Sequence, residues 1–194
     1  SEAVFGYATA APEIDTRTLR AARPSDGGIT WTATFTPSAS VTDTTNLITL
    51  DNTGIADLAG NAGSGTTDSN NYAIDTQRPT ATIVVADSTL TAGETTLVTF
   101  TFSEAVTGFS NADIVIANGT LTAVSSSDGG ITWTATFTPN VGVNDATNLI
   151  MLANTGIADL AGNAGSGTTN SNNYTIDTVL PTATIIVSDP SLKI

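Results

Sequence analysis

Two residue types are missing from this sequence. It contains no cysteine and no histidine. Without cysteine the chain has no disulfides, no thiolate chemistry and no cysteine-type zinc site. Without histidine it lacks the commonest general base and metal ligand. Any metal bound here would have to be a hard cation held by oxygen atoms.

Positive charge is scarce. Five lysine and arginine residues stand against 18 aspartate and glutamate residues, for a net charge of −13. This charge repels phosphate backbones and anionic lipid surfaces, so we expect no nucleic-acid partner. No apolar run approaches the roughly 18 residues that a spanning helix needs, so we expect no membrane insertion. An acidic chain attracts cations, although acidic residues also serve simply to keep a protein soluble.

The residues that are abundant favour strands and turns. The polar part of the sequence is mostly threonine, serine, asparagine, glycine and aspartate. Branched threonine suits a pleated sheet, while asparagine, aspartate and glycine suit turns. The composition therefore indicates an all-β protein.

An internal repeat defines the domain organisation. The twelve residues DGGITWTATFTP begin at Asp26 and again at Asp128, and NTGIADLAGNAGSGTT begins at Asn52 and again at Asn154. Both pairs are 102 residues apart. A period of this length corresponds to a whole domain, so the sequence predicts an array of independently folded copies.

The ends of the sequence fall inside copies of this repeat. Ser1 aligns with Ser103, and Pro181 aligns with Pro79. We therefore expect a piece of a longer array: residues 1–76 as a truncated first copy lacking its first strand and most of its second, 77–178 as a complete second copy, and 179–194 as the start of a third. The truncated copy is expected to be the less stable one, since part of its core is missing.

One stretch breaks the repeat. Residues 5–24 read FGYATAAPEIDTRTLRAARP where the second copy has TGFSNADIVIANGTLTAVSS. Three of the five basic residues, Arg17, Arg20 and Arg23, lie here, and Pro12 replaces Ile114 of an expected strand. One hypothesis is a compensated frameshift or sequencing error, and the other is a genuine functional divergence.

Alternation and turn residues predict seven strands in the second copy. Their expected ranges are about 81–86, 95–102, 113–117, 121–125, 131–137, 148–152 and 173–177. Seven short strands separated by turns are typical of an immunoglobulin-like β-sandwich. The whole chain is thus predicted to be tandem immunoglobulin-like β-sandwiches.

The strand at 131–137 alternates cleanly. Ile131, Trp133, Ala135 and Phe137 are expected on the core face, and threonines occupy the other face. Such a threonine ladder is most often the solvated side of a half-buried strand. A ligand face for a sugar or for ice is the alternative. The glycine-rich segments at Gly60 and Gly162 lack the lysine of a phosphate-binding loop, so we interpret them as long flexible loops.

The segments SEAVTGF, SSSDGGITWTATFTP, ANTGIADLAGNAGSGTT and NNYTIDTVLPTATI resemble the bacterial immunoglobulin-like repeats of giant secreted adhesins and biofilm-associated surface proteins. The resemblance covers essentially the whole chain except residues 5–24. It implies a location outside the cell or on its surface, export by type I secretion, and calcium bound at domain junctions.

Acidic residues gather at one expected pole of the second copy. Because sandwich strands alternate in direction, the loops that carry Glu104, Asp128 and Asp159 should meet where the first strand begins, and the linker from the preceding copy delivers Asp75 there. Converging carboxylates repel unless a cation separates them, and calcium accepts six to eight oxygen ligands. We expect Asp75, Glu104 and Asp159 as the main ligands, with Asp128 and Asn163 as further candidates. By the repeat, Glu2 and Asp57 would serve the preceding junction and Asp177 the following one.

Competing interpretations remain open. The acids at 75 and 177 could be plain linker residues, and those at 57 and 159 could cap turns. The leading functional hypothesis is a structural spacer, stiffened by calcium, that contacts neighbouring repeats of its own chain while other domains hold a host or cell-surface ligand. The alternative is a module that itself binds carbohydrate, a host protein or neighbouring cells. An enzyme is disfavoured, since the acids recur at equivalent loop positions rather than in one cleft.

Overall fold

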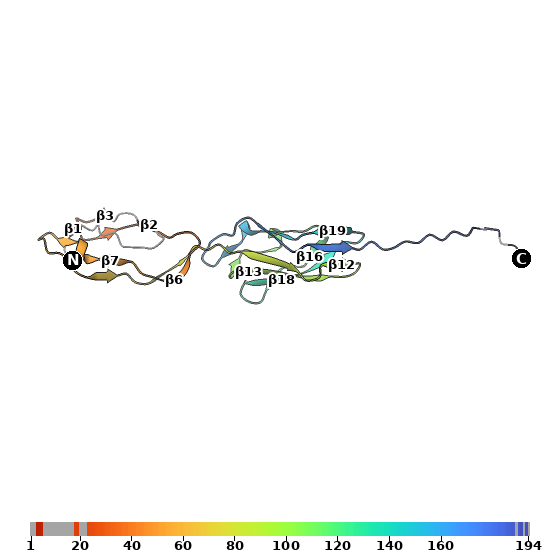
Figure 1. The fold of residues 1–194 in the computed structure, drawn as a ribbon, viewed down its shortest axis with the longest axis horizontal. Helices are drawn as coiled ribbons and strands as arrows, with labels where there is room; N and C mark the ends of the chain where they lie inside the picture. Colours follow the sequence, from red (N-terminus) through yellow and green to blue (C-terminus); the bar gives the residue numbers. More distant parts are fainter. Residues whose placement is uncertain (1–2, 6–17, 20–22, 189, 192, 194) are drawn as a thin grey trace. The chain divides into compact units, whose positions relative to one another are not determined.

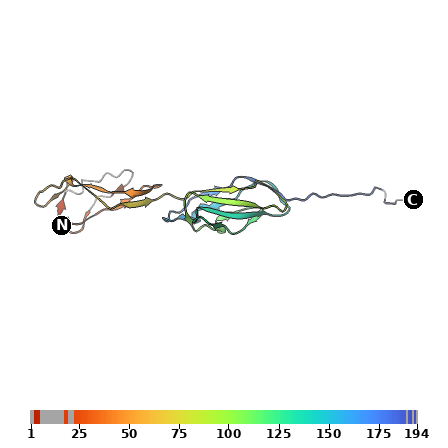
Figure 2. The same cartoon turned by 90° about the horizontal axis from the view of Figure 1, so that it is seen from below.

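The computed structural model describes residues 3–5, 18–19, 23–188, 190–191 and 193, coloured along the chain in Figures 1 and 2. The chain divides into two compact units, Ser1–Arg78 and Pro79–Ile194. Apart from three short 3₁₀ turns, the regular structure of the described residues is β-strand. The all-β class predicted from composition is confirmed.

The main sheet of the second unit is antiparallel. It runs in the order β11 (Ala81–Val85), β13 (Thr96–Phe102), β18 (Thr132–Pro139) and β16 (Gly119–Leu121), and β17 (Ser125–Ser126) also pairs with β18. Strands β13 and β18 lie side by side (Figure 1), with Phe100 opposite Trp133. Both strands alternate large apolar residues with threonine, which places one face of the sheet in the core.

Smaller sheets complete the unit. Strand β12 (Thr89–Thr91) pairs in parallel with β23 (Tyr174–Asp177), which pairs with β19 (Asn144–Asn148). Strand β20 (Met151–Ala153) lies between β15 (Ile114–Val115) and β22 (Thr168–Asn170). Strand β14 (Val106–Thr107) pairs with β21 (Ala158–Asp159). The 3₁₀ turns η3 (Asn111–Asp113) and η4 (Asn154–Gly156) precede β15 and β21.

Aromatic rings link the two faces of the core. The ring of Phe109 contacts those of Phe100, Phe102 and Trp133, at centroid distances of 5.2–5.3 Å. Trp133 packs against the buried cluster, and its indole N–H donates to the carbonyl of Gly130 (3.1 Å). The predicted role of Trp133 as a core anchor is therefore confirmed.

Three sequence predictions for this unit were wrong in detail. The expected strand at 148–152 spans a break, because the buried Asn148 turns its amide to the carbonyls of Asp145 and Tyr174 and the register shifts there. The segment after Gly162, expected to be only a flexible loop, continues into β22, which pairs with β20. Ile131, expected on the core face, lies at the end of its strand and is 41% exposed.

The first unit repeats the pairings of the second. Its pairs are β1 (Val4–Phe5) with β8 (Ala56–Asp57), β2 (Thr18–Leu19) with β5 (Phe35–Thr36), β3 (Arg23–Pro24) with β4 (Trp31–Thr32), β6 (Thr42–Asn46) with β10 (Tyr72–Asp75), and β7 (Thr49–Asp51) with β9 (Thr66–Asp68). The 3₁₀ turn η2 (Asn52–Gly54) matches η4. The 102-residue period in sequence is thus also a period in structure.

Burial differs sharply between the units. Of sixteen buried apolar residues among those described, fifteen lie in the second unit and only Ile74 lies in the first. Phe35 is only partly buried, whereas its equivalent Phe137 is fully buried. The first unit therefore has much less hydrophobic stabilisation among its described residues.

The aberrant stretch at 5–24 is described only in part. Arg23–Pro24 pairs with Trp31–Thr32, as Ser125–Ser126 pairs with the equivalent part of β18. Pro12, Arg17 and Arg20 lie outside the described residues, so both explanations of this stretch stay predictions. Within the described parts of the chain, no helix is long and apolar enough to cross a bilayer.

Candidate functional site

Three segments of the second unit meet around Val106. The short pairing of β14 with β21 sets Val106 opposite Asp159. The turn before β18 docks on the same residue, since the backbone N–H of Val106 donates to the carbonyl of Gly130 (3.1 Å). The sequence prediction that these loops share one pole rests on strand alternation, and the structure brings all three segments together.

Two carboxylates approach one another at this place. Glu104 precedes Val106 by two residues, and one of its carboxylate oxygens lies within 4.8 Å of one from Asp159. Asp159 is only 3% exposed and Glu104 is partly buried. Two negative charges this close and partly removed from water repel each other, so the arrangement favours an added cation.

Asp159 is fixed in place by Asn163. The backbone N–H of Asn163 donates to Oδ1 of Asp159 (2.8 Å), and its side-chain amide donates to Oδ2 (2.8 Å). Burial is the largest influence on the pKa of Asp159 and raises it, but hydrogen bonds from Asn163 and the loop backbone outweigh burial and hold the pKa below its usual value. The carboxylate is therefore ionised at neutral pH.

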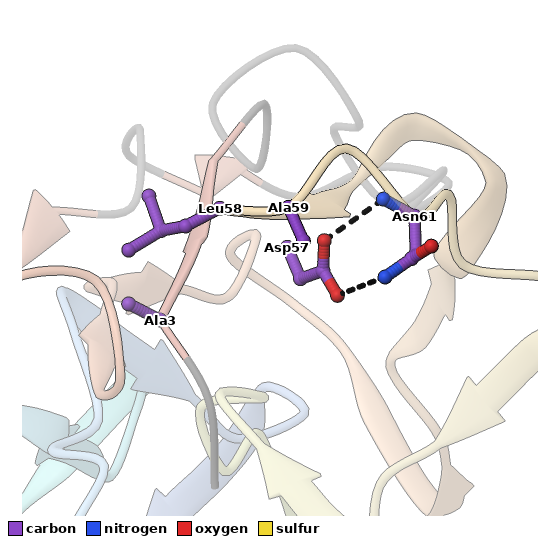
Figure 3. Close-up of a pocket in the computed structure, with 5 residues that line it drawn as sticks. All are labelled: Ala3, Asp57, Leu58, Ala59 and Asn61. Atoms are coloured by element: carbon purple, nitrogen blue, oxygen red, sulfur yellow. Dashed lines mark hydrogen bonds between the residues drawn. The ribbon is translucent and has the colours of Figure 1, made fainter.

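The first unit repeats this clamp. Asn61 donates from its backbone and side chain to the two oxygens of Asp57, at 2.8 and 2.7 Å (Figure 3). These hydrogen bonds lower the pKa of Asp57, and the bond from the Asn61 side chain has the largest effect. Asp57 and Asn61 line a pocket of about 470 Å³ with Ala3, Leu58 and Ala59 (Figure 3). Asp57 and Asp159 therefore do cap turns, which is one of the two interpretations that the sequence offered for them.

An exposed leucine accompanies each clamp, and the sequence analysis did not single it out. Leu58 is 78% exposed and its equivalent Leu160 is 76% exposed. The signal was available, since ADLAGN repeats with its leucine unchanged. An apolar side chain beside the clamp makes this pole apolar as well as acidic.

Asp128 closes the turn in which it lies. Its carboxylate accepts hydrogen bonds from the Ser126 hydroxyl (2.9 Å) and from the backbone N–H groups of Ile131 (3.2 Å) and Thr132 (2.9 Å). These bonds, with those from Thr132 the strongest, lower the pKa of Asp128 to about 2. The turn that it closes is the one that docks on Val106, so Asp128 helps to position the pole.

The two linker aspartates have matching surroundings. Asp75 ends β10 and accepts from the backbone N–H of Gln77 (3.2 Å), and Asp177 ends β23 and accepts from that of Val179 (3.2 Å). The next residue in each copy is a threonine whose hydroxyl donates to a carbonyl of its own unit, at 2.7 Å in both cases. Both linkers thus leave their units through the same turn. Glu2, expected to act at the preceding junction, lies outside the described residues.

Comparison with known proteins gives the family. The family described as bacterial Ig-like domain matches residues 1–74 and 75–176. The chain belongs to this family. Bacterial Ig-like repeats were expected from the resemblance of the motifs, and the immunoglobulin-like class is confirmed.

A solved structure gives a distant likeness. It is described as "FdeC, a Novel Broadly Conserved Escherichia coli Adhesin Eliciting Protection against Urinary Tract Infections", and it shares 14% identity with a TM-score of 0.36. The alignment covers 90% of this chain and 50% of that one, so the present chain spans about half the length of its structural neighbour. No curated protein sequence matches the chain.

The donors at the pole of this Ig-like repeat suit a hard cation. Glu104 and Asp159 offer carboxylate oxygens, and the chain has no cysteine or histidine to attract a softer metal. Calcium tolerates carboxylates in one- or two-oxygen binding and fills its shell with carbonyls and water. Magnesium demands a stricter octahedral geometry. The donor types present are therefore compatible with calcium.

Proposed function

We propose that the chain is a non-catalytic spacer from a bacterial surface or secreted adhesin, in which calcium bound between consecutive Ig-like repeats stiffens the stalk. The observation that carries this proposal is the close pair of carboxylates, Glu104 and partly desolvated Asp159, at the pole where the chain enters the second unit. A calcium ion between them would remove their repulsion and add attraction in its place.

Chain connectivity supports Asp75 as the third ligand. Thr80 is held beside Ser103 by two hydrogen bonds: its N–H donates to the Ser103 hydroxyl (3.0 Å) and its carbonyl accepts from the Ser103 N–H (2.9 Å). Glu104 is the next residue. Four residues separate Asp75 from Thr80, so the linker confines Asp75 to within about 18 Å of it. An ion shared by Asp75 and the pair would tie the linker to the following unit.

A metal bridge between the linker and the following unit would have a mechanical consequence. A linker held only by its two covalent ends is a hinge, whereas one also held through a metal loses most of its rotational freedom. Repeating the tie in each copy would turn a flexible array into a rod that holds a distal adhesive domain away from the cell. Asp57 and Asp177, with Glu2, would serve the same role at the flanking junctions.

The alternative, a repeat that itself binds carbohydrate or a host protein, calls for an exposed aromatic cluster or a deep groove. Among the large apolar side chains described as exposed, Phe5 is the single aromatic. This distribution favours the spacer. Location at the cell surface, type I secretion and a role in biofilms follow from the adhesin proposal and are part of it.

Thermal unfolding of the full chain in calcium and in chelator tests the proposal. Calcium should raise the midpoint of the second unit, in proportion to RT ln(1 + [Ca²⁺]/Kd). Glu104→Gln, Asp159→Asn and Asp75→Asn should each abolish most of that rise. Glu94→Gln is the matched control, because it removes one charge far from the pair in sequence and its amide oxygen can still accept the Thr91 N–H that Glu94 accepts at 2.7 Å.

Two outcomes would count against the proposal. An unchanged midpoint at millimolar calcium would leave the acids as turn caps and solubilising charges. A rise retained in Glu104→Gln and Asp159→Asn would mean that calcium acts elsewhere on the acidic surface.

A further inference from the structure

The outer face of the main sheet in the second unit is made mostly of threonine. Alternation turns one set of side chains from each strand away from the core. We call this set the threonine face; its members are Thr82 and Val84 of β11, Leu97, Thr99 and Thr101 of β13, Thr132, Thr134, Thr136 and Thr138 of β18, Thr120 of β16 and Ser125 of β17. In the register of the sheet, Thr82, Thr101 and Thr132 form one row across three strands, and Val84, Thr99, Thr134 and Ser125 form the next.

No member of this face is charged, although the repeat is strongly acidic and the carboxylate of Asp128 reaches the edge of the face, where it accepts from the N–H of Thr132 (2.9 Å). Residues 79–178 contain eight acidic residues and no basic residue. All eight lie outside the threonine face, in turns, at strand ends or on the other strands; they are Asp87, Glu94, Glu104, Asp113, Asp128, Asp145, Asp159 and Asp177. Two copies of this repeat would repel each other through any surface that bears these acids. The threonine face is the broad surface through which they can approach without that repulsion.

Two aliphatic side chains lie on one side of the face, Val84 on the edge strand β11 and Leu97 on the neighbouring strand β13. Val84 is 53% exposed and Leu97 is 49% exposed. Val84 lies opposite Thr99 in the register, and the N–H of Ala86 donates to the carbonyl of Leu97 (3.0 Å), so Val84 and Leu97 are diagonal neighbours on adjacent strands. Together with the threonine methyl groups they leave apolar surface in water that a partner could cover.

We propose that the threonine face binds the same face of a second copy of this chain, so that stalks associate side by side. A threonine hydroxyl both donates and accepts, so a surface of threonines is complementary to itself in a two-fold pairing. With the two-fold axis beside Val84 and Leu97, this apolar pair meets its own counterpart in the second copy. This association is independent of the calcium proposal, since no acidic residue takes part.

The repeat multiplies such a contact. In the first unit Thr30, Thr32, Thr34 and Thr36 occupy the positions equivalent to the ladder of β18, and all four are exposed. A single pairing of this kind is weak, because it has no buried aromatic anchor. Many pairings in register along two stalks add up through effective concentration. Lateral association should therefore depend steeply on the density of chains on a surface.

Clustering of microspheres densely coated with the full chain, in chelator, tests this proposal. Coated spheres should cluster, and clustering should strengthen as sodium chloride rises from low ionic strength to 0.5 M, because salt screens the repulsion between the acidic poles but not the uncharged contact. Leu97→Glu and Thr99→Glu should each abolish clustering by placing charge on the face. Leu149→Glu is the matched control, since Leu149 is 45% exposed and lies between β19 and β20, away from this sheet.

Each variant is first checked for a wild-type circular dichroism spectrum and cooperative unfolding, so that loss of clustering is not loss of fold. Wild-type spheres that stay dispersed at every salt concentration would overturn the proposal, as would equal clustering by Leu97→Glu and wild type. Dispersed spheres that nonetheless bind immobilised oligosaccharides or ice, with loss in Thr99→Glu, would assign the face to a small ligand instead.

Discussion

At the scale of single residues, side-chain amides replace backbone partners wherever the strands break. Asn148 bridges two backbone carbonyls, and its own oxygen accepts a bond from Asn118 (2.8 Å). Asn118 has the left-handed φ of 58° that its turn requires, and it also donates to Asp145 (3.0 Å). Asn172 accepts from the N–H of Val85 (2.8 Å) and donates to its carbonyl. Asparagine is frequent in this chain because one side chain supplies both halves of a peptide pairing.

The buried side chain of Tyr174 has an unsatisfied polar group. It is fully buried, and its hydroxyl has no hydrogen-bond partner among the described residues. Burial, together with the negative charge of Asp145, raises its pKa to about 12. A buried hydroxyl without a partner costs about 1–3 kcal/mol. Tyr174→Phe should therefore raise the free energy of unfolding of the second unit by about 1 kcal/mol, measured by urea titration.

Tyr72 is the matched position in the first unit, and its hydroxyl also has no hydrogen-bond partner among the residues that the structure describes. Tyr72→Phe should leave the unfolding transition of the second unit unchanged. Destabilisation by Tyr174→Phe would instead reveal a bound water joining the hydroxyl to a polar neighbour such as Asp145.

Asp128 links stability to pH. Its pKa in the folded state, about 2, lies below the ordinary value of 3.8 because Thr132, Ser126 and Ile131 donate to the charged form. A carboxyl with a lowered folded pKa stabilises the fold above its unfolded pKa, and this contribution is lost as pH falls toward the folded pKa. The thermal midpoint should thus fall between about pH 4 and pH 2. Asp128→Asn should have a lower midpoint at pH 7 and a shallower fall across that window, and parallel curves for the two proteins would refute the assignment.

At the scale of elements, the sequence predicted strands best where one face is buried. The strand ending at Phe102 alternates apolar and polar residues over seven positions, and its bounds agree within a residue. Prediction failed where side chains rather than backbone periodicity end a strand. Asn148 looks like an ordinary strand position in sequence, and only its burial reveals that it splits β19 from β20. Strand β12 was missed because a three-residue parallel pairing leaves too little pattern.

The candidate site was predicted in part for the same kind of reason. Strand alternation alone placed the loops of Glu104 and Asp159 at one pole, and their carboxylates do approach each other. The clamp by Asn163 could not be derived, since it depends on how a glycine-containing turn folds back on Asp159. The turn role of Asp128 was likewise hidden, because it needs the positions of three donors from a single turn.

The turn that docks on Val106 gives a prediction at this scale. Gly130 has φ +100°, and a Cβ placed there would lie 2.7 Å from the carbonyl oxygen of Val106. Gly129 has φ +79°, with nothing within 4 Å of such a Cβ. Gly129→Ala should cost about 1–2 kcal/mol for the left-handed conformation alone. Gly130→Ala should cost more, because the turn must also move away from Val106.

Chemical denaturation of the two variants measures the difference. If calcium raises the midpoint of wild type, Gly130→Ala should also weaken that effect, because Val106 lies opposite Asp159 and follows Glu104 by two residues. Equal losses of stability in both variants would show that the turn does not rest on Val106.

At the scale of the whole molecule, acidic side chains are absent from one broad surface of the complete repeat. The acids of the complete repeat lie in its turns, at strand ends and on the smaller sheets, while the outer face of its main sheet has none. If both proposals hold, each repeat would bind a cation at its acidic pole and a second copy through the outer face of its main sheet. The two proposals concern these two surfaces separately, and a variant of one should leave the other intact.

The units should differ in how readily they open. Among the residues described, fifteen buried apolar side chains stabilise the second unit, whereas Ile74 is the single buried apolar side chain in the first. Ala135 is 3% exposed, whereas its equivalent Ala33 is exposed, so the same sequence packs less well in the first unit. Amide protection reflects the free energy of local opening, which falls where few apolar contacts are buried. Hydrogen exchange followed by mass spectrometry should show rapid exchange in β5 and β6 and slow exchange in β13 and β18. Because β5 and the second half of β18 have the same sequence, their intrinsic strand propensities are equal and cannot cause a difference in exchange rate. Equal protection of the amides in β5 and β18 would mean that the first unit gains a core from residues outside those described.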